Sequence, residues 1–174
     1  MPHTAACHPA APRTIAIGDI HGCVQALGAI LDAIQPLRDD RLVLLGDYVD
    51  RGPDSRAVID RLLELDTRCQ MVPLLGNHEL MLLRSRESVD ERRFWLQYGG
   101  RETLDSYGGR LDGIPPAHLE FLRRSCCMAF ETETHVFVHA NYEPGLELAD
   151  QPESVLLWTH LSDTVPPPHR SGKT

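Results

Sequence analysis

Aspartate, histidine and asparagine side chains recur in three glycine-flanked segments of this chain, and these residue types suit metal binding. The segments read Gly-Asp-Ile-His-Gly, Gly-Asp-Tyr-Val-Asp-Arg-Gly and Gly-Asn-His-Glu, and they begin at Gly18, Gly46 and Gly76. Two divalent cations roughly 3.5–4 Å apart need a bridging carboxylate and several oxygen or imidazole ligands. The candidate ligands in these segments are Asp19, His21, Asp47 and Asn77.

The chemistry and position of each candidate ligand suit metal binding. Asp19 and His21 lie two residues apart in one turn, so the turn can aim both side chains at one cation. Asp47 follows an equivalent apolar run, where its carboxylate can bridge two ions. Asn77 offers a neutral carbonyl oxygen, which adds no charge at the second cation. Taken singly, each segment also fits a turn or a helix cap; taken together and in order, they predict a two-metal centre.

The elements around these segments are predicted to bring them together. Apolar runs at 14–17, 42–45 and 71–75 precede the three segments, and helical spacing follows at 24–34, from about Asp54 to Leu65, and up to about Arg86. About thirty residues separate one polar segment from the next, which is the length of a βαβ crossover. Right-handed crossovers would place three parallel strands in one sheet, with all polar loops at its carboxyl edge. Pro73 indicates an irregular or edge position for the third strand.

The remaining chain carries weaker patterns. Residues 87–124 are predicted to be helical, with breaks at Gly99-Gly100 and Gly108-Gly109 and a last helix at 116–124, and strand character returns at 127–131 and 135–138. The first twelve residues are expected to be a disordered lead-in and the last twenty a loop, which leaves one domain over 13–174. Surface roles are expected for His118 and His135, whereas His160 and His169 lie in a loop that could reach the site.

Composition excludes some classes of partner. The 174 residues include 25 acidic and 17 basic side chains, for a net charge of −8, which argues against nucleic-acid and membrane binding. A phosphorylated substrate is not excluded, because bound divalent ions invert the local field. Five cysteines without a Cys-x-x-Cys pair predict reduced thiols and a cytoplasmic location; they are Cys7, Cys23, Cys69, Cys126 and Cys127.

The three segments closely resemble signature motifs of the phosphoprotein phosphatase branch of calcineurin-like metallophosphoesterases, in particular bacterial-type serine/threonine protein phosphatases. Val-Phe-Val-His-Ala at 136–140 resembles a fourth motif, whose histidine binds the second metal. The resemblance covers roughly residues 13–174 and implies an α/β fold, a four-layer αββα sandwich of two mixed sheets flanked by helices. It also implies two divalent ions, manganese first, with iron or zinc as alternatives. By this match Asp19, His21 and Asp47 hold one metal, and Asp47, Asn77 and His139 hold the other.

The resemblance further implies hydrolysis of a phosphate monoester by a hydroxide that bridges the metals, without a phosphoenzyme. Arg51 and Asn77 would contact the phosphate, His78 would protonate the leaving oxygen, and Asp50 would hold the His78 imidazole. Phosphoserine or phosphothreonine in proteins is the expected substrate. A symmetrical diadenosine tetraphosphate hydrolase and a metal-binding pseudoenzyme are the alternatives, and the oligomeric state stays open.

Two departures from the family pattern, a missing histidine ligand and a missing arginine, support the pseudoenzyme alternative. A further family histidine in a Gly-His-Thr-type motif normally follows a segment like 171–174, and the sequence stops at Thr174 before it. The domain is therefore expected to be C-terminally incomplete, with an exposed sheet edge prone to association. An arginine that many relatives carry is missing near Trp158, and Asn141 replaces a glycine.

Overall fold

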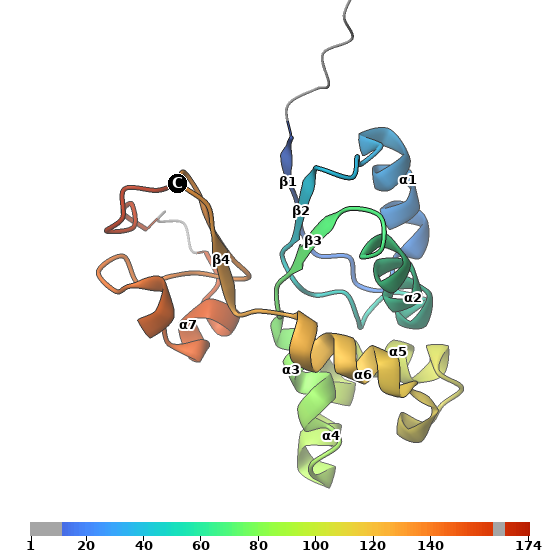
Figure 1. Cartoon of the computed structure of the whole chain (residues 1–174). Coiled ribbons are helices and arrows are strands. Elements are labelled where there is room, and N and C mark those ends of the chain that lie inside the picture. Colours follow the sequence, from blue (N-terminus) through green and yellow to red (C-terminus); the bar gives the residue numbers. More distant parts are fainter. Residues whose placement is uncertain (1–11, 162–165) are drawn as a thin grey trace, which may run out of the picture.

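Three parallel strands form the centre of the fold. The computed structural model describes residues 12–161 and 166–174. The strands β1 (Thr14–Ile17), β2 (Arg41–Leu44) and β3 (Gln70–Pro73) are hydrogen-bonded in the order β1-β2-β3. Two helices, α1 (Val24–Ile34) and α2 (Ser55–Leu65), connect them and lie together on one side of the sheet (Figure 1). The predicted pair of βαβ crossovers is therefore confirmed.

The α2 helix begins and packs as its sequence predicts. Asp54 is its N-cap, and the Asp54 side chain accepts a hydrogen bond from the Ala57 amide at 2.9 Å. Such a bond satisfies one of the free amides of the first helical turn. Val58, Ile59 and Leu62 recur at helical spacing, and all three side chains are fully buried. Their apolar face holds the helix against the sheet.

The two faces of the sheet have different neighbours. Ile15, Ile17, Leu42 and Leu44 belong to the main hydrophobic core together with residues of α1 and α2. The intervening residues must point to the other face, because side chains alternate along a strand. On that face Val43 is fully buried, whereas Val72 is half-buried and Ala16 is exposed. The second face is therefore apolar but only partly covered.

A helical region follows the third polar segment and covers the carboxyl end of the sheet (Figure 1). Its elements are α3 (Asn77–Arg84), α4 (Val89–Trp95), the π-helical turn η1 (Leu96–Gly100), α5 (Arg101–Ser106), the short 3-10 helix η2 (Leu111–Gly113), α6 (Pro116–Glu120) and the π-helical turn η3 (Phe121–Ser125). The predicted breaks are present, since Gly99 lies inside η1 at φ +103° and Gly108 and Gly109 follow α5. The predicted helix at 116–124 is also present, with a last turn that is π-helical.

The predicted second pair of strands is a hairpin. β4 (Ala129–Glu131) and β5 (Val136–Val138) pair antiparallel, and a single parallel bridge joins Leu74 after β3 to Cys127 before β4. Thr174 donates to the Thr134 carbonyl and accepts from the Val136 amide, which is the pattern of a parallel pair beside β5. Among the described residues the first sheet is parallel throughout, and mixed directions occur only around the hairpin.

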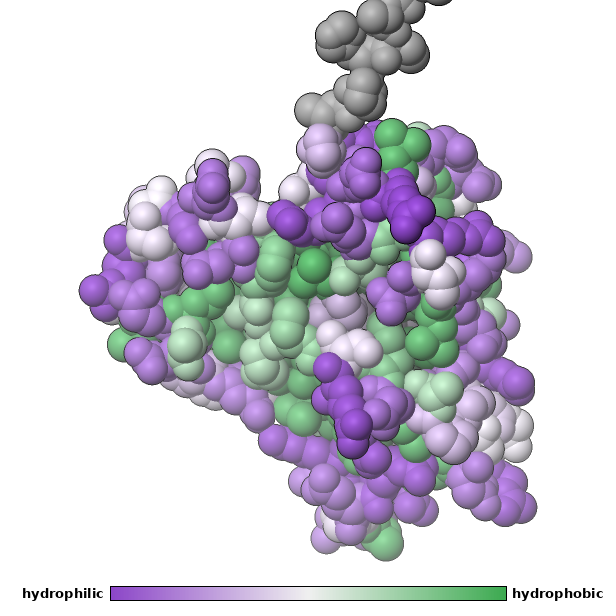
Figure 2. All heavy atoms as spheres, in the orientation of Figure 1, coloured by the Kyte–Doolittle hydropathy of each residue, from purple (hydrophilic) through white to green (hydrophobic). Residues whose placement is uncertain are grey.

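Apolar side chains gather on the surface between the hairpin and the three-stranded sheet, as Figure 2 shows. Phe130, Val136, Phe137 and Val138 of the hairpin are only half-buried. This surface continues the partly covered second face of the first sheet. The molecule thus has one closed core beneath α1 and α2 and one open apolar face.

Two expectations from the sequence are wrong. The last twenty residues are not all loop, because α7 (Glu153–Trp158), which follows the 3-10 turn η4 (Leu148–Asp150), reaches into them and buries Leu156 and Leu157. His118 does not have a surface role. It is 4% exposed, its Nδ1 accepts from the Tyr107 hydroxyl at 2.8 Å, and its Nε2 lies 3.0 Å from an Asp60 carboxylate oxygen.

The remaining expectations concern the lead-in, the cysteines and the location of the protein, and the structure tests them only in part. Apart from Pro12, the expected lead-in lies outside the described residues. Four cysteines, Cys23, Cys69, Cys126 and Cys127, carry free thiols in the described part of the chain, whereas Cys7 lies outside it. Within the ranges 12–161 and 166–174, no helix has the length and apolarity that a bilayer crossing requires. The cytoplasmic location is untested.

Candidate metal centre

The three polar segments leave the carboxyl ends of β1, β2 and β3 and interlock there. The amides of Ile20 and His21 both donate to the Asp47 carbonyl, at 2.9 and 2.8 Å, and the Gly22 amide donates to the Tyr48 carbonyl at 2.8 Å. These bonds join the first polar segment to the second. The expected convergence of segments that are distant in sequence is therefore present.

Four residues of these segments that are not glycine have left-handed backbone conformations. They are His21 (φ 43°), Asp47 (φ 53°), Asp50 (φ 71°) and Arg51 (φ 65°). Side chains other than glycine adopt this region at a cost, and such residues cluster at functional sites. Two of these residues, His21 and Asp47, have side chains that approach each other to 3.4 Å.

Asp47 lies at the middle of the candidate ligands. One carboxylate oxygen, Oδ2, is 3.4 Å from His21 Nε2, and the other, Oδ1, is 3.5 Å from His139 Nε2. The Asp47 side chain is 6% exposed. A carboxylate with one oxygen on each side is the arrangement that a bridging ligand needs.

Both histidines present the nitrogen that a metal requires. His21 Nδ1 lies 2.8 Å from the Val49 carbonyl, and His139 Nδ1 lies 2.7 Å from the Leu45 carbonyl. A carbonyl only accepts, so each Nδ1 carries a proton, and Nε2, which faces Asp47, is the nitrogen that can bind a cation. Ligand histidines in metalloproteins are oriented by such backbone bonds.

Asn77 provides the clearest sign that the residues fit a cation. It is the first residue of α3, and its Oδ1 is buried without a hydrogen-bond partner among the described residues. A buried polar atom without a partner is rare in folded proteins, because its desolvation is not compensated. A divalent cation would supply that partner.

Asp19 lies at the outer side of the centre. Its side chain is 56% exposed, and its Oδ2 is 3.9 Å from His21 Nε2. Asp19, Asp47 and His139 each offer a ligand atom within 4.8 Å of the others, and so do His21, Asp47 and His78. The residue set therefore suits divalent ions, with Asp47 common to both groups.

Glu79 organises the loop that carries Asp47, a role that sequence reasoning missed. It is fully buried, and its carboxylate accepts from the amides of Asp47 (2.8 Å), Tyr48 (2.8 Å), Val49 (3.2 Å) and Gly76 (2.9 Å). Burial, followed by the nearby Asp47 charge, raises the pKa of Glu79 to about 8. An acidic residue three positions after a helix N-cap is the signal that could have identified it.

Gly76 leaves the space in which the centre is built. A Cβ atom at this position would lie 2.3 Å from Asp47 Oδ1 and 2.4 Å from the Asp47 amide nitrogen. No side chain can occupy that position without moving Asp47. The glycine before Asn77 is therefore required by close backbone approach.

A buried histidine–carboxylate pair lies next to the ligands. His78 Nδ1 is 2.7 Å from Asp50 Oδ2, and neither residue is more than 1% exposed. His78 Nε2 faces Asp47 at 3.9 Å. Arg51 extends over the centre from outside, with Nη1 2.8 Å from His21 Nε2. The structure thus brings together all the residues that the sequence assigned to catalysis.

A small cavity of about 240 Å³ opens over the centre. Its lining residues are Asp19, Asp47, Arg51, Asn77, His139, Ala140, His160 and Leu161. His160 therefore reaches the site. His169 does not line this cavity. Its ring is instead hydrogen-bonded to the Leu146 carbonyl at 2.7 Å and to the Ser171 hydroxyl at 2.8 Å.

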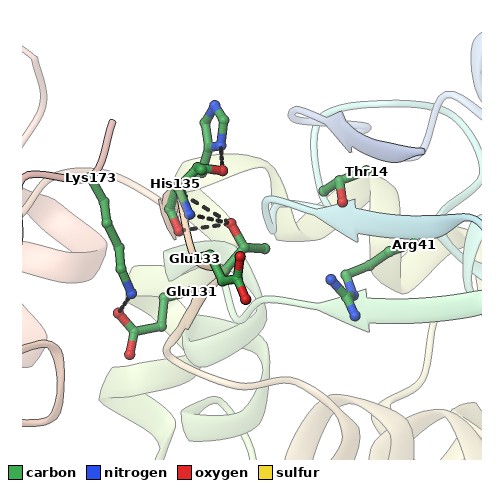
Figure 3. A pocket seen from close by; sticks show the side chains of 8 residues that line it. Thr14, Arg41, Glu131, Glu133, His135 and Lys173 are labelled. Carbon is green, nitrogen blue, oxygen red and sulfur yellow. Dashed lines mark hydrogen bonds and ion pairs between the residues drawn. The ribbon is translucent and has the colours of Figure 1, made fainter. Parts of the chain in front are cut away.

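A larger cavity, of about 760 Å³, lies between the hairpin turn and the first sheet. Figure 3 shows Glu131 paired with Lys173 there, with Arg41 on the opposite wall. Neither of the groups that could hold a metal contributes a residue to it. The candidate chemistry therefore belongs to the smaller cavity.

Comparison with known proteins agrees with this geometry. A family model described as calcineurin-like phosphoesterase matches residues 12–168. The chain belongs to the calcineurin-like phosphoesterase family. This membership accounts for the α/β fold with sheets flanked by helices, and for the clustered metal-ligand types at the carboxyl edge of the first sheet. The phosphoprotein phosphatase branch within the family is not resolved by this match.

Two curated relatives from different bacteria carry the same name. A protein of Pseudomonas fluorescens named bis(5'-nucleosyl)-tetraphosphatase, symmetrical, is 34% identical over 153 residues, which cover 82% of the chain and 50% of the relative. A Coxiella burnetii protein of the same name is 34% identical over 166 residues, covering 91% and 51%. The chain thus spans about half the length of the curated relatives it matches.

Solved structures of the family are similar in fold. A protein solved as a candidate diadenosine tetraphosphatase matches with a TM-score of 0.60 and 26% identity, over 82% of the chain and 57% of that protein. A protein serine/threonine phosphatase from Saccharomyces cerevisiae also matches with a TM-score of 0.60, at 19% identity, over 91% of the chain and 52% of that protein. The second likeness concerns the fold alone.

Proposed function

We propose that this calcineurin-like phosphoesterase is a metal-dependent hydrolase whose substrate is a symmetrical dinucleoside tetraphosphate. The position of Asp47 between His21 and His139 carries the proposal of a two-metal hydrolase. The substrate follows the names of the curated relatives. This ranking reverses the order expected from the motifs, where a phosphoprotein substrate came first.

Five residues would hold the two divalent ions: Asp19, His21, Asp47, Asn77 and His139. When bound, such ions supply an activated water and neutralise charge on phosphate oxygens. Manganese, iron and zinc all suit mixed oxygen and imidazole ligands. Bound cations would also allow a chain with a net charge of −8 to accept a polyanionic substrate.

Three further residues would take part in the reaction, two at the substrate and one behind His78. Arg51 lines the cavity, and its guanidinium can bind two phosphate oxygens in a fork. His78 in its doubly protonated form would keep Nδ1–H on Asp50 and deliver its Nε2 proton to the leaving oxygen, which leaves a neutral imidazole. The leaving group of a symmetrical tetraphosphate is a nucleoside diphosphate.

The test measures turnover of diadenosine tetraphosphate by the full 174-residue chain after manganese loading and after chelation. We expect metal-dependent release of adenosine diphosphate as the single product, at a rate that Asp47→Asn reduces at least a hundredfold. Asp39→Asn is the matched control, because Asp39 is an exposed aspartate distant from the centre. Loading with iron or zinc in parallel identifies the preferred metal.

Two further substrates separate the alternatives. Turnover of a phosphoseryl peptide with little turnover of diadenosine tetraphosphate would restore the phosphoprotein phosphatase. The absence of turnover on both, and on p-nitrophenyl phosphate, with the chain folded and manganese bound, would identify a metal-binding pseudoenzyme.

A further inference from the structure

The Asp50 carboxylate has hydrogen-bond donors beyond His78, and they come from a separate part of the chain. Trp95 Nε1–H points at both Asp50 oxygens, 3.0 Å from Oδ1 and 2.9 Å from Oδ2. The Thr103 hydroxyl lies 2.7 Å from Oδ1. Asp50, Trp95 and Thr103 are all fully buried. Water therefore does not compete for these bonds.

The backbone of Asp50 is held by the same segment. The Asp50 amide lies 2.8 Å from Thr103 Oγ1 and 3.1 Å from Ser55 Oγ, and the two hydroxyl oxygens are 2.7 Å apart. A carboxylate oxygen only accepts, so the Thr103 proton goes to Asp50, and the Ser55 hydroxyl must donate to Thr103. The network is complete, with a single arrangement of protons.

Close packing fixes the segment that supplies these donors. A Cβ atom on Gly100 would lie 2.3 to 2.6 Å from three atoms of the Trp95 indole, so the backbone runs directly against the ring. The Gly99 carbonyl accepts from the Arg51 amide at 3.0 Å, which ties the segment to the second polar motif. The indole therefore has little freedom to turn away from Asp50.

These contacts determine which way the Asp50 carboxylate faces. With Oδ1 held by Thr103 and both oxygens held by Trp95, Oδ2 is left directed at His78 Nδ1. Without these donors, the carboxylate could rotate and the imidazole could tilt away from the leaving group. In buried networks each bond orients its neighbour, so remote members influence the reactive group.

We propose that Trp95 and Thr103 are positioning residues for proton delivery: they hold Asp50 so that His78 presents its Nε2 proton to the leaving oxygen. This inference rests on the proposed function of His78. It assigns a role in the reaction to the helices α4 and α5, which contribute no candidate metal ligand.

The test compares two phosphate monoesters whose hydrolysis depends to different degrees on protonation of the leaving oxygen by a general acid. Phenolate, which is as basic as a tyrosine side chain, leaves poorly without a proton, whereas p-nitrophenolate leaves well. In Trp95→Phe we expect kcat on phenyl phosphate to fall about ten- to a hundredfold. On p-nitrophenyl phosphate we expect a loss within about threefold, with KM and bound manganese unchanged in both assays.

Two matched variants accompany it. Thr103→Val removes the hydroxyl and should reproduce the selective loss, while Thr103→Ser keeps the hydroxyl and should retain activity. Trp158→Phe makes the same change in the other tryptophan of the chain and should leave kcat on both esters unchanged. An equal loss on both esters, or a loss of bound manganese, would overturn the positioning role, because a general disturbance of the fold acts in that way.

A second readout does not depend on turnover. The His78 Nδ1 proton should give a protected, strongly downfield NMR signal that is present in the full chain and absent in Asp50→Asn. If the proposed function fails and the chain is inactive, loss of this signal in Trp95→Phe still supports the positioning role. Its persistence in both Trp95→Phe and Thr103→Val would contradict that role.

Discussion

The two oxygens of Asp47 face different histidines, so a single substitution there affects both halves of the centre. Asn77 differs, because its one carbonyl oxygen can serve only one cation. These two positions therefore offer a way to separate the two ions.

Asn77→Ala should remove one bound manganese and leave the other. The Asn77 Oδ1 has no hydrogen-bond partner in the described structure, so its loss should leave the melting temperature of the metal-free chain almost unchanged. Metal analysis after dialysis measures the stoichiometry. Asn77→Asp, which keeps an oxygen in place, should retain both ions; equal metal loss in the two variants would show that this oxygen is not a ligand.

His118 should make stability depend on pH near neutrality. Burial lowers the pKa of His118, only partly offset by Asp60, so the folded chain binds the ring proton less readily than the unfolded chain. The unfolded chain takes up the proton near the ordinary value of about 6.5. Stability should therefore be fully present above about pH 6.5 and be lost as the pH falls below it.

His118→Gln keeps groups that can bond Tyr107 and Asp60 but does not titrate. Its melting temperature should fall less than that of the parent chain between about pH 7 and pH 5.5. If the melting temperatures of the two proteins change in parallel over this pH range, His118 does not contribute to the pH dependence of stability.

At the residue scale, prediction from sequence reached the groups that carry chemistry and missed those that hold them. Asp19, His21 and Asp47 are visible because their types and spacing are those of a metal site. Trp95 and Thr103 act on Asp50 from 45 and 53 positions away. Nothing in their own neighbourhood signals this contact, because it depends on how the α4–α5 region packs.

At the scale of elements, the regular units were predictable and the irregular ones were not. β1, α1, β2 and α2 follow clear periodicity, and the Asp54 cap marks the start of α2. The α7 helix has only six residues and begins after a proline, so its sequence carries too few turns for a periodic pattern. Pro73 lies at the end of β3, where the Pro73 carbonyl accepts from the Cys127 amide at 3.0 Å and a single parallel bridge follows at Leu74, so the strand is bordered on its other side only at this end.

The first two strands are joined at their start by Asp40. Its carboxylate accepts from the amides of Arg13 (2.9 Å) and Leu37 (2.8 Å) and from the Arg13 guanidinium. These bonds, the guanidinium first, hold the pKa of Asp40 well below its usual range. The carboxylate thus anchors β1 beside β2.

Asp40→Asn should lower the melting temperature at neutral pH. Because the pKa of the folded state is depressed, the stabilisation is present above about pH 4 and is lost as the pH falls further. The difference in melting temperature between the variant and the parent chain should therefore become smaller as the pH falls below about 4. Asp39→Asn, at the exposed neighbouring aspartate, should show no such difference.

At the scale of the whole molecule, metal binding and stability should be coupled. The candidate ligands come from segments after three strands and from the end of β5, so bound ions would join distant parts of the chain. Manganese at about a hundred times its dissociation constant should raise the melting temperature by about 5–10 °C. Differential scanning calorimetry with and without chelator measures this. Asp47→Asn should abolish most of the rise, and an undiminished rise would place the ions elsewhere.

The open apolar face is the second feature at this scale. Hairpin residues such as Phe130 and Phe137 stay half-buried, and the green surface in Figure 2 shows how far this face extends. The sequence indicated the strands but not this exposure, because burial depends on which elements cover a sheet. The chain spans about half the length of the curated relatives it matches.

The left-handed backbone at His21, Asp47, Asp50 and Arg51 affects how a saturation mutagenesis screen of this chain must be interpreted. The present residues already bear the cost of this backbone, and replacements that tolerate it less well, β-branched residues above all, add a further conformational penalty whatever their side chains do to the chemistry. Abundance would fall together with activity, and a screen for activity alone would confuse misfolding with lost chemistry. Asparagine and glycine tolerate this backbone best. Comparing these two replacements at each position separates the demand for a functional group from the demand for a turn.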